Sequence, residues 1–151
     1  MHYKTVKDVV DHSRRLHQQI SQLYQEIRQE QSQERVKMLL DYLKRHEDHL
    51  EQSLEKFEKD KSQKVLDSWF QYVPDQDISE VLEQVDINDH MSVDEVILMA
   101  LKLDDYFIDL YEGMVEHSSS SAVQSVFQNL LDMEQQEKIR TARTALNMSD
   151  M

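Results

Sequence analysis

The chain has 151 residues, of which 31% are charged and 39% hydrophobic, and its formal net charge is −13. Such acidity disfavours binding to nucleic acid or to an anionic membrane, and the absence of cysteine excludes disulfides, thiolate zinc sites and iron–sulfur ligation. One glycine and one proline are too few for a fold rich in turns, so the composition favours an all-α protein with a single domain over residues 1–151.

Apolar residues recur at helical spacing in four stretches, which predict helices at about residues 5–30, 33–60, 93–117 and 121–148. The third helix has a strong start signal, because Ser92 and Glu95 have the spacing of a capping box. The first two helices are joined almost directly, and so are the last two, which makes each pair an antiparallel hairpin. The sequence therefore predicts a four-helix bundle in which helices two and three are joined by a long crossover.

The crossover, residues 61–92, is long enough to run the length of the bundle. Its apolar pattern predicts short helices at residues 65–72 and 78–85. Three aromatic residues in it are expected to fasten the crossover onto the bundle, with a ligand pocket as the alternative. They are Trp69, Phe70 and Tyr72.

No apolar stretch approaches the roughly 18–20 residues that span a bilayer. The first residues lead into an amphipathic pattern and lack the apolar core of a signal peptide. We therefore expect a cytoplasmic protein without membrane or nucleic-acid partners.

Six imidazole or carboxylate side chains interrupt the apolar faces near the middle of the four helices. Burying such a group without a partner costs several kcal/mol, so six of them together indicate a shared purpose. Residues three apart lie on one helix face and can contact the same centre. The six are His17 on the first helix, His46 and His49 on the second, Asp104 on the third, and Glu134 and Glu137 on the fourth.

The two predicted hairpins repeat this pattern. His17 precedes Tyr24 by seven residues, as Asp104 precedes Tyr111. The pair His46-x-x-His49 begins 29 residues after the first ligand of its hairpin, and Glu134-x-x-Glu137 begins 30 residues after its own. Glu47 and Asp105 adjoin these positions, so a local change of helix register would exchange neighbours.

With this pattern the chain resembles the ferritin-like superfamily, nearest to its rubrerythrin and bacterioferritin branch, over nearly its whole length. The resemblance implies a two-metal site with a glutamate from helices one and three and Glu-x-x-His from helices two and four. Only His49 and Glu134 keep the family's residue type at their positions. Family members use such centres for dioxygen or peroxide chemistry and for iron oxidation or storage.

Two interpretations remain open. In the first, the chain is a metal-binding protein with iron, or with zinc, manganese or another divalent metal, because three imidazoles and three carboxylates suit borderline metals. In the second, the centre binds no metal, protonated histidines pair with the carboxylates in a buried network, and the bundle is a structural or protein-interaction module.

Enzymatic activity, the electron donor and the oligomeric state, a homodimer or larger homo-oligomer included, are left open. The other histidines are expected at the surface, namely His2, His12, His90 and His117.

Overall fold

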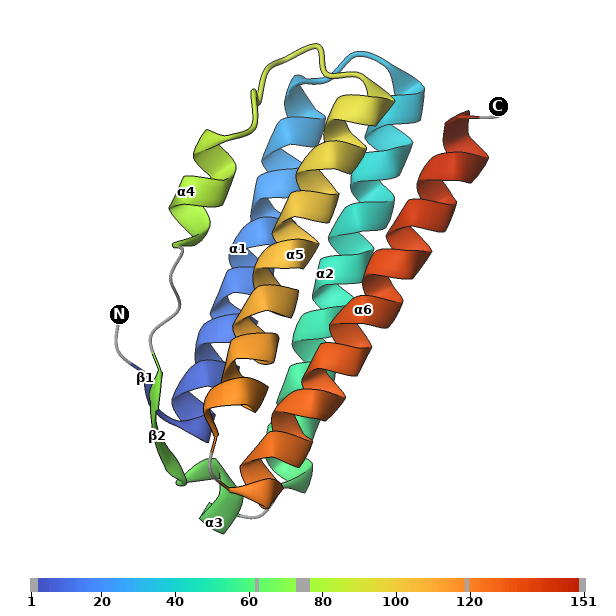
Figure 1. Cartoon of the computed structure of the whole chain (residues 1–151). Coiled ribbons are helices and arrows are strands. Elements are labelled where there is room, and N and C mark those ends of the chain that lie inside the picture. The colour runs from blue at the N-terminus through green and yellow to red at the C-terminus, as the bar shows by residue number, and fades with distance from the viewer. Residues whose placement is uncertain (1–2, 62, 73–76, 119, 150–151) are drawn as a thin grey trace.

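The computed structural model describes residues 3–61, 63–72, 77–118 and 120–149. Over these residues the chain forms four long helices, in agreement with the predicted bundle and its crossover (Figure 1). None of the described helices is long and apolar enough to cross a membrane. The four helices are α1 (Val6–Glu30), α2 (Glu34–Asp60), α5 (Val93–His117) and α6 (Ser121–Ser149).

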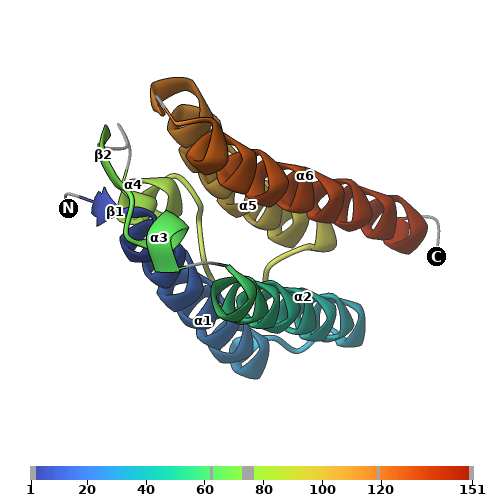
Figure 2. The same ribbon diagram turned by 90° about the horizontal axis from the view of Figure 1, so that it is seen from below.

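Helices α1 and α2 form one hairpin, and α5 and α6 form the other, so that the bundle has two layers when viewed along its length (Figure 2). The apolar stripes of all four helices meet between the layers in one core. The largest side chains in that core include Tyr24 from α1 and Phe107 and Tyr111 from α5, all of them almost fully buried. The two hairpins are therefore joined mainly by apolar packing, which the helical periodicity of the sequence anticipates.

Local signals fix where the helices begin. Thr5 and Asp8 form a capping box at the start of α1, and Ser92 and Glu95 form the predicted one at the start of α5. Between α1 and α2, the side chain of Gln31 donates a hydrogen bond to the carbonyl of Asn88 (2.7 Å) and accepts one from the backbone N–H of Met91 (2.9 Å). This clamp ties the α1–α2 corner to the end of the crossover, just before α5 begins.

The crossover runs along the length of the bundle, as predicted, but with different local structure (Figure 1). It contains α3 (Gln63–Leu66), the strand β2 (Trp69–Tyr72) and α4 (Ile78–Glu83). Strand β2 pairs antiparallel with β1 (Tyr3–Thr5) in a two-stranded ribbon.

The prediction of a helix over residues 65–72 is thus wrong. The aromatic run from Trp69 to Tyr72 has strand propensity, and the extended N-terminal residues provide a pairing partner that helical periodicity does not reveal. The side chain of Trp69 is 74% exposed, so it does not fasten the crossover to the bundle. The side chains of Phe70 and Tyr72 lie outside the described residues.

Candidate metal centre

Five of the six residues predicted as ligands lie in the interior of the bundle. His17 and Glu134 are fully buried, and Asp104, Glu137 and His46 retain at most 7% of their surface. The sixth, His49, is exposed on α2, so its predicted place in the interior is wrong. Of the other histidines, His90 and His117 lie at the surface and His12 is half-buried, whereas His2 lies outside the described residues.

Glu47 takes the place in the interior that was predicted for the histidine pair of α2. The buried stripe of α2 passes through Leu43, Glu47, Leu50 and Leu54, a spacing of three and four residues that keeps one helix face towards the core. His46 lies at the edge of this stripe, and His49 falls beyond it. Glu47 itself is only 1% exposed.

His17 lies between two carboxylates from different helices. Its Nδ1 is hydrogen-bonded to Glu47 on α2, and its Nε2 lies 3.0 Å from an oxygen of Glu134 on α6. The ring also stacks on Phe107 of α5, with centroids 4.0 Å apart and planes 13° apart. Only the protonated imidazole has two N–H donors, so this arrangement corresponds to a cation that bridges two carboxylates.

Electrostatics favour the same protonation state. Burial by itself lowers the pKa of His17, but the charges of Glu47 and Glu134 and the hydrogen bonds to them outweigh burial and raise the pKa to about 10. His17 is therefore an imidazolium at neutral pH. It supplies positive charge at the centre of the bundle.

His46 is held from one side only. Its Nδ1 lies 2.8 Å from an oxygen of Glu137, whose other oxygen accepts a hydrogen bond from Arg140 at 2.9 Å. The hydrogen bond with His46, above all, lowers the pKa of Glu137. The other ring nitrogen, Nε2, is buried without a hydrogen-bond partner among the described residues. A histidine whose Nδ1–H donates to a carboxylate while Nε2 stays free has the arrangement seen in metal-binding histidines.

Two buried carboxyl groups at the centre are also incompletely paired. Within the described part of the chain, Oδ2 of Asp104 and Oε2 of Glu134 have no hydrogen-bond partner. Burial and the charges of Glu47 and Glu134 raise the pKa of Asp104 well above its usual range. Burial also raises the pKa of Glu134, although His17 opposes this. The centre thus holds more carboxyl groups than one imidazolium can neutralise.

Tyr24 belongs to the same environment. Its side chain is 1% exposed, and burial followed by the charges of Glu47 and Asp104 raises its pKa well above that of a free phenol. The phenol therefore stays protonated and presents a hydrogen-bond donor to a region rich in carboxyl groups.

The two-metal set of ferritin-like proteins does not fit these residues. With Glu47 as the interior carboxylate of α2, the residue three positions later is Leu50, and the one three positions after Glu134 is Glu137, so neither helix has the Glu-x-x-His pair. His17 itself stands between Glu47 and Glu134 and is hydrogen-bonded to both. Moreover, no three side chains of the His, Cys, Asp and Glu types in the described ranges are arranged to hold a metal ion as they stand.

What the centre does offer is three unpaired donor atoms. Nε2 of His46, Oδ2 of Asp104 and Oε2 of Glu134 come from three different helices. One imidazole nitrogen and two carboxylate oxygens suit a single divalent transition metal. The three donor types are those of a single-ion site, although the three side chains do not converge on a metal position as they stand.

Glu47 is the central residue that sequence reasoning missed, although a signal for it was present. Glu47 follows His17 by 30 residues, the same separation as between Asp104 and Glu134. The predicted pair His46-x-x-His49 departs from this repeat by one residue.

Comparisons with known proteins support the fold. No protein-family model matches the sequence, and no curated protein matches it. A solved structure described as a ferritin-like diiron-carboxylate protein from Thermotoga maritima matches with a TM-score of 0.62 and 18% sequence identity, covering 96% of this chain and 97% of that one. At that identity the likeness shows that this chain has a ferritin-like fold.

Proposed function

We propose that this chain is a ferritin-like protein that binds a single divalent transition metal, iron or else manganese or zinc, in metal handling. The observation that carries the proposal is the set of three buried donor atoms without partners, on His46, Asp104 and Glu134. Unpaired polar atoms in a protein interior each cost about 1–3 kcal/mol, so three at one centre call for an explanation. A bound cation would satisfy all three.

The charges of the centre are consistent with one divalent ion. When Asp104 is ionised, it contributes three negative charges together with Glu47 and Glu134, and the His17 imidazolium contributes one positive charge. The remaining two negative charges equal the charge of one divalent cation. Glu137 does not enter this balance, because Arg140 pairs with it.

In this reading His17 is a positioning residue and not a ligand. Its two hydrogen bonds hold Glu47 and orient Glu134 so that the free Oε2 remains available. Binding would require Asp104 to lose its proton and the three donor side chains to turn towards a common point, since they do not form a site as they stand. Because the pKa of Asp104 is raised, metal uptake should release protons.

Which reactions the protein could support depends on the metal that it binds. Iron or manganese would permit the dioxygen or peroxide reactions of the rubrerythrin and bacterioferritin branch, whereas zinc has no redox chemistry. Storage or transfer of a single ion requires no electron donor, which makes metal handling the simpler proposal.

A second candidate function rests on the ion pairs of His17. An imidazolium between Glu47 and Glu134, together with the His46–Glu137 pair, forms a polar network that is coherent without metal. The bundle would then be a structural or protein-interaction module whose network fixes how the two hairpins pack.

Metal analysis of the untagged protein, grown with iron, manganese and zinc available, separates the two candidates. The metal proposal expects about one ion per chain, and thermal unfolding should occur at higher temperature with metal than with chelator. A metal present at 100 times its Kd stabilises the folded state by about 2.7 kcal/mol. Asp104→Asn and His46→Gln should abolish this gain, whereas His49→Gln, an exposed neighbour on α2, should leave it unchanged. Protein that contains no metal and shows no metal-dependent stabilisation would favour the metal-free network.

A further inference from the structure

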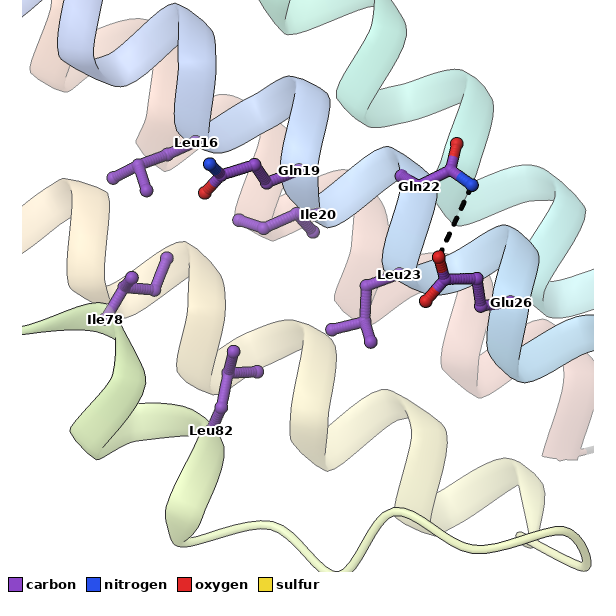
Figure 3. A pocket seen from close by; sticks show the side chains of 8 residues that line it. All are labelled: Leu16, Gln19, Ile20, Gln22, Leu23, Glu26, Ile78 and Leu82. Atoms are coloured by element: carbon purple, nitrogen blue, oxygen red, sulfur yellow. Dashed lines mark hydrogen bonds between the residues drawn. The ribbon is translucent and has the colours of Figure 1, made fainter.

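The crossover helix α4 leaves an apolar groove between itself and α1. Val81 of α4 packs into the core with 4% of its surface exposed, whereas its neighbours Ile78 and Leu82 are only partly buried. Across from these two residues lies one face of α1 that carries Leu16, Ile20 and Leu23 (Figure 3). The groove between the two helices has a volume of about 320 Å³.

The rim of the groove is polar on the α1 side only. Glu26 and Gln22 stand at its edge, and the Gln22 amide donates a hydrogen bond of 3.4 Å to the Glu26 carboxylate (Figure 3). No lysine or arginine is among the described residues that line the groove. The polar groups at the rim are therefore two amides, Gln19 and Gln22, which can both donate and accept hydrogen bonds, and one carboxylate, Glu26, which carries the only charge among the described lining residues.

The groove has the size and lining of a site for a small organic ligand. Ligand pockets range from about 300 to 1,000 Å³ and are mostly apolar with a few polar groups that orient the ligand. An anionic head group would meet the Glu26 carboxylate in a protein of net charge −13. A head group that donates hydrogen bonds, such as an alcohol or an ammonium, would instead find an acceptor.

We propose that the α1–α4 groove binds an amphiphile with a hydrocarbon body and a neutral or cationic hydrogen-bond-donating head group. The hydrocarbon lies between Leu16, Ile20 and Leu23 on α1 and Ile78 and Leu82 on α4. The head group lies at Glu26. This site is separate from the buried centre and does not depend on whether that centre binds metal.

The experiment titrates the full chain with three probes of equal chain length below their micelle concentrations: 1-decanol, decylammonium and decanoate. Binding is followed by the methyl NMR signals of Ile20, Leu23 and Leu82 and by calorimetry. We expect saturable one-to-one shifts of these signals with decanol and decylammonium, and at least tenfold weaker binding of decanoate. Absence of saturable shifts with every probe would overturn the proposal, as would equal affinity for all three.

Two variants test the position of the ligand. Leu23→Trp fills the groove and should abolish binding, whereas the control Leu98→Trp, at a leucine of α5 that is 55% exposed, should not. Glu26→Lys places a positive charge at the rim and should invert the preference in favour of decanoate, while Glu30→Lys, at the exposed end of α1, should not. Circular dichroism establishes that each variant is folded. Binding that survives Leu23→Trp, or a head-group preference that ignores Glu26→Lys, would contradict the assignment.

Discussion

Replacement of His17 by leucine tests the central ion pairs most directly. The substitution keeps the apolar volume next to Phe107 but removes the cation between Glu47 and Glu134, so that two carboxylates remain buried without it. The folded-state pKa of His17 is about 10, compared with 6.5 for a free imidazole. At about 1.4 kcal/mol for each tenfold change in proton affinity, this difference corresponds to about 5 kcal/mol of stabilisation below pH 6.5, of which about 4 kcal/mol remains at pH 7. Loss of one partner from a buried ion pair typically costs about 3–5 kcal/mol, which agrees.

The assay is urea unfolding in the presence of chelator, followed by circular dichroism. We expect His17→Leu to lower the free energy of unfolding at pH 7 by about 3–5 kcal/mol. His49→Leu, at an exposed position of α2, should change it by less than about 0.5 kcal/mol. Because the pKa of His17 is raised on folding, its stabilisation is full below pH 6.5 and is lost as the pH rises through about 10. The difference between wild type and His17→Leu should therefore shrink as the pH rises from 6.5 to about 10 and stay small above that.

Neutralising the carboxylates as well provides the decisive comparison. The triple variant His17→Leu, Glu47→Gln, Glu134→Gln should be more stable than His17→Leu alone, because it no longer buries unpaired charge. A cost below about 1 kcal/mol for His17→Leu, or the same cost at pH 7 and pH 10.5, would refute the reasoning.

Two further predictions concern other parts of the bundle. Ser92→Ala removes the side-chain acceptor of the α5 capping box and should lower the free energy of unfolding by about 1 kcal/mol, measured by urea unfolding, with exposed Ser79→Ala as a control. Burial, the hydrogen bond with Asp11 and the charge of Asp11 raise the pKa of Glu58 to about 7, from 4.5. Stability should therefore fall as the pH rises from 4.5 through 7, and Glu58→Gln should flatten this part of the melting-temperature profile; an unchanged slope would contradict it.

The helical part of the fold follows from the sequence because its signals are local. Residues three and four apart share a helix face, and capping residues such as Ser92 mark where helices begin, so long amphipathic helices can be located without knowledge of their partners. The β1–β2 ribbon could not be found in this way. Its strands pair Tyr3 with Tyr72 and Thr5 with Trp69, and such a pairing depends on a contact between distant segments.

The candidate centre was predicted to the level of the helix face but not of the single residue. One helical residue corresponds to a rotation of about 100°, so an error of one position exchanges interior and surface. On α5 the prediction of Asp104 as the interior residue agrees with the structure. Asp104 is buried, whereas its neighbour Asp105 accepts a hydrogen bond from Lys138 nearer the surface. On α2 the prediction placed His49 in the interior of the bundle. The continuous buried stripe of that helix instead includes Glu47 and leaves His49 out.

A variant that carries the two-metal ligand set of ferritin-like proteins provides a gain-of-function test of the helix register in which Glu47 faces the core. If Glu47 and Glu134 are the interior carboxylates, the two-metal set needs imidazoles at positions 50 and 137 and a carboxylate at 17. The triple variant His17→Glu, Leu50→His, Glu137→His supplies them, and Asp104 remains as the carboxylate of α5. We expect this variant to bind about two ions of iron or manganese per chain, measured by metal analysis after dialysis, whereas the wild type binds one at most.

The matched control carries His17→Glu and Glu137→His but keeps Leu50, and it should bind fewer ions because the imidazole of α2 is missing. If the control gains as much metal as the triple variant, position 50 does not face the centre. The register based on Glu47 would then be wrong, because a side chain three residues after Glu47 must lie on the same helix face.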